Sequence, residues 1–76
     1  MKDLSLFLIS NITGSNDISV AETQEEGRTI IDVTAEKSVV GLIIGKEGKT
    51  IKNLRRILAI RAAKEDTMVS VNVHEA

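Results

Sequence analysis

A stretch rich in glycine and lysine, Gly-Leu-Ile-Ile-Gly-Lys-Glu-Gly-Lys-Thr-Ile, occupies positions 41–51 and contains the best candidates for a ligand-binding site. Two glycines separated by two polar residues join two apolar runs, which is typical of a tight turn between helices. Gly45 would supply the left-handed conformation that ends a helix after Ile44, and Gly48 would let a ligand approach the backbone. The next helix then begins with unpaired N–H groups and a partial positive charge. This stretch therefore predicts an anion-binding turn.

The charged residues are distributed unevenly, although the net charge of the 76 residues is only −1. Residues 1–36 contain two basic and seven acidic side chains, whereas residues 45–64 contain seven basic side chains against Glu47 alone. A segment with a charge of +6 indicates a basic surface for a polyanion. A solvated basic helix would have the same composition, and it is the glycine turn that favours ligand binding.

Catalytic and metal-binding functions have little support in the sequence. The chain has no cysteine, so thiolate chemistry and disulfides are excluded. The stretch Gly45–Thr50 resembles the tail of a phosphate-binding P-loop, but that motif needs its first glycine where Ile43 stands. His74 is the sole histidine and has no nucleophile near it, and the acidic residues from Glu22 to Glu26 suit an exposed strand edge. We therefore expect neither an enzyme nor a bound metal or cofactor.

Hydrophobic periodicity and turn residues predict the helices and strands around this turn. The first helix would end at a loop over residues 13–16, and a turn over residues 26–28 would join two strands as a hairpin. The predicted order is a helix over Lys2–Ile12, strands over Ile18–Glu25 and Thr29–Thr34, helices over Val39–Ile44 and from the glycine turn to about Lys64, and a strand over Met68–Val73. This order predicts one α+β domain over residues 1–76, with three helices on one face of a mixed three-stranded sheet.

The pattern also predicts a core and a surplus of apolar residues. In the first helix, helical spacing assigns Leu4, Phe7, Leu8 and Ile12 to the core, while Leu6 and Ile9 would either lie at its edge or contact another subunit. Ser38 would cap the short helix, and Thr29, Ser70 and Asn72 would lie on the open face of the sheet.

The long helix divides into faces when its residues are projected at 100° per residue. The core face would carry Ile51, Leu54, Leu58 and Ala62, and the basic face Lys49, Lys52 and Arg56. Arg55 lies beside the core face and is expected to pair with an acidic residue of the domain. Ile57 and Ile60 lie outside the core face, which suggests a surface for a partner.

The stretch Ile43–Ile51 resembles the hydrophobic-Ile-Gly-x-x-Gly-x-x-Ile signature of KH domains, with the flanking helices and strands that the signature requires. The element order resembles the bacterial, type II KH arrangement, αββααβ. In its length and its N-terminal helix, the chain is similar over essentially its whole extent to the small stand-alone bacterial KH RNA-binding proteins of the KhpA type.

This resemblance implies a clamp for about four nucleotides of single-stranded RNA. Gly45, Lys46, Glu47 and Gly48 would hold the sugar-phosphate backbone, and the strand around Ile30–Val33 would form the other wall of an aliphatic groove. With the neighbouring apolar and basic residues, the expected RNA-binding set is Ile43, Ile44, Gly45, Lys46, Glu47, Gly48, Lys49, Thr50, Ile51, Lys52 and Arg56. Leu42 replaces a basic residue common in relatives, and Glu47 places a negative charge in the clamp, so we expect modest affinity.

Other expectations concern partners and location. The sole aromatic residue, Phe7, is assigned to the core, so binding would rest on phosphate contacts and aliphatic packing rather than on stacking. Relatives imply a homodimer, or a heterodimer with a second KH-containing RNA-binding protein. The alternative is an assembly module with weak or lost RNA binding. The apolar run Leu4–Ile9 is too short to cross a bilayer, so we expect a cytoplasmic protein without a membrane partner.

Overall fold

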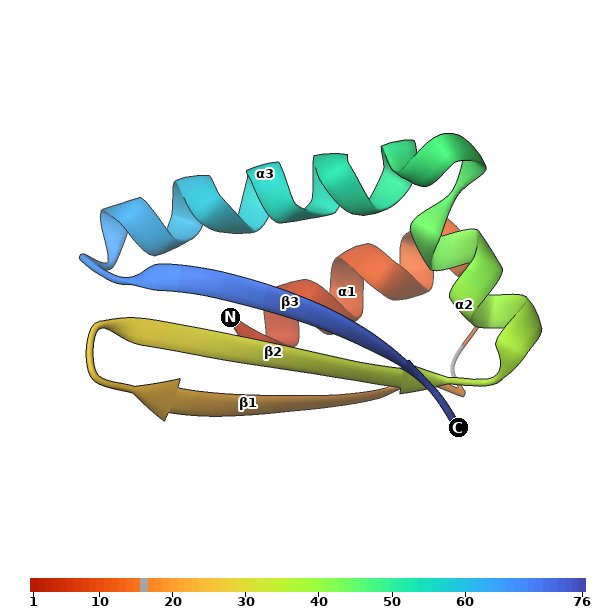
Figure 1. Cartoon of the computed structure of the whole chain (residues 1–76), viewed down its shortest axis with the longest axis horizontal. Coiled ribbons are helices and arrows are strands. Elements are labelled where there is room, and N and C mark those ends of the chain that lie inside the picture. Colours follow the sequence, from red (N-terminus) through yellow and green to blue (C-terminus); the bar gives the residue numbers. More distant parts are fainter. Residues whose placement is uncertain (16) are drawn as a thin grey trace.

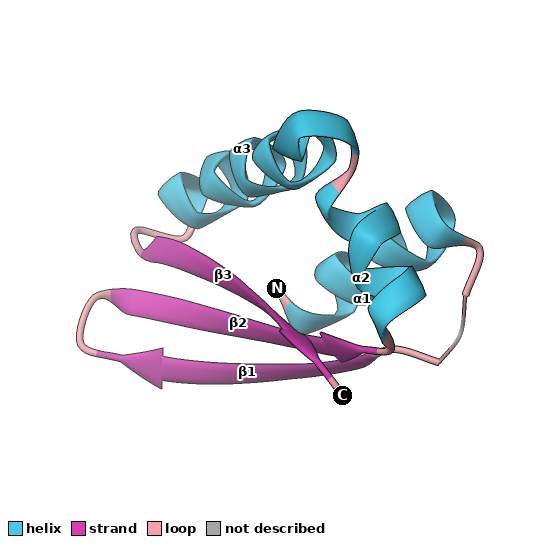
Figure 2. Ribbon diagram, turned by 45° about the vertical axis from the view of Figure 1, so that its right-hand side comes forward, coloured by secondary structure: helices cyan, strands magenta, loops and turns pink. Residues whose placement is uncertain are grey.

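In the part of the chain that the structure describes, three α-helices cover one face of a three-stranded sheet and leave its other face open (Figure 1, Figure 2). The computed structural model describes residues 1–15 and 17–76, so the predicted loop residue Asn16 lies outside the described residues. The elements are α1 (Lys2–Thr13), β1 (Ser19–Glu25), β2 (Arg28–Ala35), α2 (Lys37–Ile44), the 3-10 turn η1 (Lys46–Gly48), α3 (Lys49–Lys64) and β3 (Met68–Glu75). The expected type II KH-like α+β fold is thus confirmed.

The sheet has the strand order β1-β2-β3. Strands β1 and β2 form an antiparallel hairpin with a two-residue turn, in which Gly27 has a φ of 68°. Strands β2 and β3 are parallel, because the chain returns to the start of the sheet through α2 and α3. Strand β2 is therefore the central strand, and β1 and β3 are the two edges.

The buried face of α1 differs from the prediction. Ile9 is completely buried, whereas Phe7 is 63% exposed and Ile12 is 44% exposed, so their assignment to the core was wrong. Ser5 takes a core position beside Ile9, since its hydroxyl donates to the carbonyl of Met1 at 2.8 Å and so is buried with its polar group satisfied. Hydrophobic spacing could not identify a serine as a core residue, so the predicted core face of α1 was rotated about the helix axis relative to the buried face in the structure.

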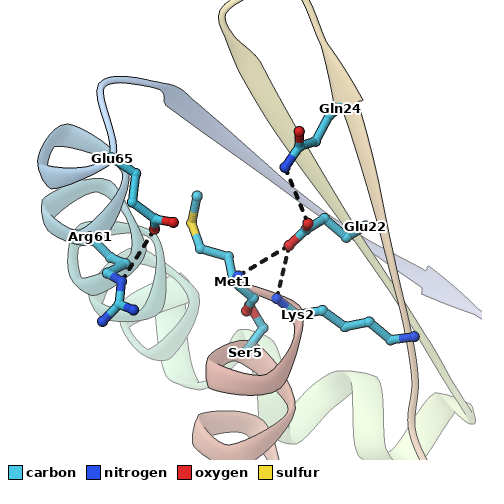
Figure 3. A network of polar contacts seen from close by, with 7 residues as sticks. All are labelled: Met1, Lys2, Ser5, Glu22, Gln24, Arg61 and Glu65. Carbon is cyan, nitrogen blue, oxygen red and sulfur yellow. Dashed lines mark hydrogen bonds and ion pairs between the residues drawn. The ribbon is translucent and has the colours of Figure 1, made fainter.

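The start of α1 is bound to β1 by Glu22, whose side chain is turned toward the helices (Figure 3). Its Oε1 accepts from the amino group of Met1 at 3.2 Å and from the backbone N–H of Lys2 at 2.9 Å. The hydrogen bond from the amino group lowers the pKa of Glu22. Glu22 was expected to be a solvated charge on a strand edge, but it accepts hydrogen bonds at the start of α1, where the N–H groups lack partners within the helix.

Strand β2 alternates strictly between the two faces of the sheet. Thr29, Ile31, Val33 and Ala35 face the helices and are buried. The prediction that Thr29 lies on the open face was therefore wrong, while Asn72 is exposed there as expected. Helix α2 begins two residues earlier than predicted, with Glu36 at its N-cap, and Ser38 donates to the Glu36 carboxylate at 3.0 Å instead of capping the helix.

Helix α3 matches the prediction in its length and in its buried face, which consists of Ile51, Leu54, Leu58 and Ala62. This face lies over β3 and completes the core with the inward residues of β2. Within the described ranges 1–15 and 17–76, no helix is both long enough and apolar enough to span a membrane.

Candidate functional site

The glycine turn is a sharp exposed bend between α2 and α3. Helix α2 ends where the N–H of Gly45 donates to the carbonyl of Gly41 at 2.9 Å. Gly45 has a φ of 75° and a ψ of 177°, so the expected positive φ is confirmed, but the backbone is extended there and not left-handed helical. Gly48, with a φ of 74° and a ψ of 15°, is the left-handed residue, and its N–H donates to the Gly45 carbonyl at 3.2 Å.

Gly45 is required by a close approach as well as by its backbone angles. A Cβ atom built on Gly45 would lie 2.6 Å from the Cβ of Thr50 and 3.1 Å from the Thr50 backbone nitrogen. The same atom built on Gly48 would have only the Cγ2 of Ile51 near it, at 4.0 Å. Thr50 thus packs directly over the first glycine, and the bend and the start of α3 form one compact unit.

The charges on this bend are exposed. Lys46, Glu47, Lys49, Lys52 and Arg56 are all accessible to solvent. Glu47 is a non-glycine residue with a φ of 58° and a ψ of 23°, a conformation that costs an L-residue about 1–2 kcal/mol. The tip of the bend therefore presents Lys46 beside a carboxylate, with the basic face of α3 following it.

The apolar members of the expected site separate into two groups. Ile43 is 1% exposed and Ile51 is 7% exposed, so both belong to the core and support the bend from within. Ile44 is 40% exposed, and Leu42 is 53% exposed on the same helix. Ile44 is thus the apolar residue of this set that a ligand at the bend could touch.

The groove that follows the bend along α3 lies between α3 and β3, and not at β2 as predicted. Strand β2 pairs with a neighbour along both edges, and Ile31 and Val33 are completely buried, so this strand has no free backbone groups for a ligand. A cavity of about 410 Å³ opens instead between α3 and β3. It is lined by Arg55, Ala59, Val69, Ser70, Val71 and Asn72.

The backbone of β3 presents a free edge to this groove. The N–H of Met68 donates to the Gly27 carbonyl at 3.0 Å, and the N–H of Ala76 donates to the Ala35 carbonyl at 2.9 Å, so even-numbered residues turn toward the β2 side. Because successive residues of a strand point their backbone groups in opposite directions, Val69, Val71 and Val73 turn theirs outward. The groove therefore has both backbone donors and backbone acceptors along one wall.

Arg55 crosses the groove from α3. Its Nη2 donates to the carbonyl of Val71 at 3.2 Å, so the expected pairing with an acidic residue was wrong. The helical projection had placed Arg55 correctly beside the core face, but the residue opposite it is a strand edge and not a carboxylate. The predicted mixed sheet already implied that β3 forms this wall of the groove. Because β2 pairs on both sides, β3 is an edge strand with free backbone groups.

The open face of the sheet carries a small polar cluster. Asp32 Oδ1 lies 2.9 Å from His74 Nε2 and accepts from Asn72 Nδ2 at 3.3 Å. The hydrogen bond with His74, and then that with Asn72, lower the pKa of Asp32. His74 is 53% exposed in its side chain, and the cluster lies on the face opposite the helices, away from the bend.

Several large apolar side chains remain exposed outside the groove. On α3, Ile57 is 46% exposed and Ile60 is 58% exposed, as expected from their place outside the core face. On α1, Leu6 is 38% exposed beside Phe7, whereas Ile9 is buried and is removed from the expected partner surface. Because α1 packs on β1 and α2, the aromatic ring of Phe7 lies on an element away from the α3–β3 groove.

Comparisons with known proteins agree with this fold. The chain is 34% identical over 76 residues to the RNA-binding protein KhpA of Chlamydia caviae, covering 99% of this chain and 97% of that protein. It is 32% identical to the RNA-binding protein KhpA of Chlamydia trachomatis with the same coverage, and 37% identical to that of Thermotoga maritima over 43 residues, 57% of each chain. No solved structure gives a significant match. The family model described as "KhpA/KhpB, KH domain" matches residues 2–73, and the chain therefore belongs to the KhpA/KhpB family of KH domains.

Proposed function

We propose that this protein binds short single-stranded RNA through the bend at Gly45–Gly48, without catalysis and with little sequence preference. KH domains of this family are not enzymes, so the chain is a binding module. Its relatives carry the name "RNA-binding protein". The observation that carries the proposal is the exposed bend, with glycines at positive φ, at the start of a helix that carries Lys49, Lys52 and Arg56 on its surface.

Binding would begin at the bend. Backbone N–H groups at the start of α3 and the ammonium group of Lys46 offer donors and positive charge to phosphate oxygens. The basic face of α3 continues the same potential, and Thr50 keeps the bend in shape by packing on Gly45. Bases would then pass the exposed Ile44 at the bend and turn toward the α3–β3 groove, where Ala59 and the free edge of β3 offer aliphatic and backbone contacts.

The affinity would be modest. Aromatic stacking contributes about 1–3 kcal/mol per base in single-strand binders, and the sole aromatic side chain is Phe7 on α1. Glu47 opposes the phosphates at the tip of the bend. We expect dissociation constants of about 1 μM or weaker, within the range of non-specific electrostatic binding.

The test is filter binding of a short single-stranded RNA to the wild type and to a Lys46→Asp, Glu47→Asp double variant. This variant changes two exposed side chains of the bend and lowers the net charge by two, and binding should be lost. The matched control is Lys37→Asp, which makes the same change of charge at the opposite end of α2 and should bind nearly as well as the wild type. If the double variant binds RNA as the wild type does, the bend is not the clamp.

A second function is favoured by the exposed isoleucines of α3. Ile57 and Ile60 project away from the core, and apolar side chains exposed together on one helix are typical of a subunit contact. We propose that this surface joins two copies, or this chain and a second KH-containing RNA-binding protein, so that two weak clamps act on one strand. Sedimentation at two protein concentrations should show association that an Ile57→Ser, Ile60→Ser variant loses. A monomer at both concentrations would refute the homodimer.

A further inference from the structure

The groove between α3 and β3 contains one hydrogen bond that spans it. Arg55 reaches from α3 and donates to the carbonyl of Val71, whose backbone groups belong to the free edge of β3. One acceptor on the outward edge of β3 is therefore already occupied by a side chain of the protein itself. A base amino group that approached the lone pair used by Arg55 would have to displace Arg55.

Arg55 is also free to leave. Its side chain is exposed, and among the ion pairs found within residues 1–15 and 17–76 none includes Arg55. A single hydrogen bond to a neutral carbonyl holds a guanidinium less firmly than a bidentate pair with an anion does. A phosphate that came within reach would thus be the stronger partner.

The position of Arg55 makes such an exchange possible. An α-helix rises about 1.5 Å per residue, so Arg55 lies roughly 10 Å along α3 from Gly48. In the helical projection it falls between the core face and the basic face that includes Lys52. Its guanidinium can therefore turn from the strand edge toward the side of α3 on which phosphates would lie.

We propose that Arg55 is a latch on the groove. In the free protein it occupies the carbonyl of Val71, and on RNA binding it moves to a phosphate and releases that carbonyl to the amino group of a base. This inference rests on the proposed function, since it describes how the same groove receives RNA. The exchange gives Arg55 a phosphate and leaves the carbonyl to the base, so in the complex an amino-bearing base gains a hydrogen bond that a base without the amino group does not.

The first test needs no RNA. The carbonyl carbon resonance of Val71 should shift in Arg55→Met, because the donor is lost while the aliphatic length is kept. The matched control is Lys52→Met, which removes one charge from the same helix three residues earlier and should leave that resonance in place. An unchanged Val71 resonance in Arg55→Met would show that the carbonyl is not occupied in solution and would overturn the latch.

The second test compares oligoadenylate with the same strand built from purine riboside, which is adenosine without its amino group. The wild type should prefer oligoadenylate by about fivefold, the worth of one ordinary net hydrogen bond, because Arg55 has left the carbonyl to the amino group. Arg55→Met should keep this preference, since its carbonyl is free from the start. A wild-type preference within about twofold, beside a roughly fivefold preference in Arg55→Met, would show that Arg55 stays on the carbonyl in the complex and would overturn the latch. Lys52→Met should weaken both strands equally and keep the ratio of the wild type.

The salt dependence of binding tests separately whether Arg55 pairs with a phosphate in the complex. If Arg55 pairs with a phosphate in the complex, the slope of log affinity against log salt should be smaller by about 0.7 in Arg55→Met. If Arg55→Met fails to fold, Arg55→Gln replaces it in these tests. The glutamine side chain is too short to span the groove, so the same changes are expected.

The outcomes separate the latch from the proposed function. If RNA binding is intact, a strand preference that is lower in the wild type than in both Arg55 variants, or a salt slope that Arg55→Met leaves unchanged, would overturn the latch alone. A wild type that binds neither strand would overturn the proposed function and the latch together. Both are supported if the Val71 resonance shifts in Arg55→Met but not in Lys52→Met, if the wild type and Arg55→Met share the preference for oligoadenylate, and if the salt slope is smaller in Arg55→Met.

Discussion

The two glycines of the bend should differ sharply in their tolerance of a methyl group, although both have a positive φ. At Gly48 the Cβ of an alanine meets only the Cγ2 of Ile51, at 4.0 Å, so the cost is that of the left-handed backbone, about 1–2 kcal/mol. At Gly45 the extended backbone with positive φ is essentially restricted to glycine and costs about 1–3 kcal/mol. The new Cβ would also lie 2.6 Å from the Cβ of Thr50, and overpacking adds about 1–3 kcal/mol.

These costs are large beside the stability of so small a domain. A chain of 76 residues is expected to unfold with a free energy of roughly 4–11 kcal/mol. Gly45→Ala should therefore remove about 2–6 kcal/mol and leave a marginal fold, whereas Gly48→Ala should remain cooperative with a loss of about 1–2 kcal/mol. The difference between the two variants isolates the contact with Thr50 and the special angles of Gly45.

The measurement is urea unfolding followed by far-ultraviolet circular dichroism, because the chain has no tryptophan or tyrosine to report by fluorescence. A double-mutant cycle adds Thr50→Gly, which removes the side chain that the new Cβ would meet. The cycle should recover about 1–3 kcal/mol of the loss in Gly45→Ala and nothing in Gly48→Ala. Equal destabilisation by the two alanines, or no coupling with Thr50, would refute the idea that Thr50 and the Gly45 backbone shape the bend.

Three further predictions concern charge. Glu47→Gln should raise affinity for single-stranded RNA about threefold at low salt, since a charge roughly 6 Å from a phosphate costs about 0.7 kcal/mol in water. The gain should vanish in about 1 M salt, where the charge is screened. An equal gain at both salt concentrations would contradict an electrostatic cause. For the wild type, if three or four phosphates are neutralised, log affinity should fall against log salt with a slope of about −2 to −3, and a flat dependence measured by fluorescence anisotropy would be incompatible with the clamp. The hydrogen bonds from His74 and Asn72 lower the pKa of Asp32 in the folded state, so they stabilise the fold above the pKa of the unfolded chain and cease to do so as the pH falls through the lowered value. Asp32→Asn should therefore unfold at lower urea than the wild type near neutral pH, and the gap should close in acid; a gap that widens in acid would reverse the assigned sign.

The sequence determined the elements, their order and the bend, because these depend on local signals. Glycine spacing at 45 and 48 predicted the end of α2 and the start of α3, and periodicity predicted the buried face of α3 residue by residue. The hairpin and the crossover predicted one antiparallel and one parallel pairing. Each of these features involves a few neighbouring residues whose backbone preferences and apolar spacing agree.

Which surfaces meet could not be predicted from local signals, because each contact depends on a partner far away in the chain. Ser5 is buried in place of Phe7 because its hydroxyl is satisfied by the carbonyl of Met1, and apolar spacing carries no information on such a bond. Glu22 serves the start of α1 only because β1 brings it there. The groove wall is β3 and not β2, because an edge strand has backbone groups free on one side, whereas both sides of a central strand are hydrogen-bonded to its neighbours. The glycine bend thus follows from local backbone preferences, whereas the strand that lines the groove follows from the pairing order of the sheet.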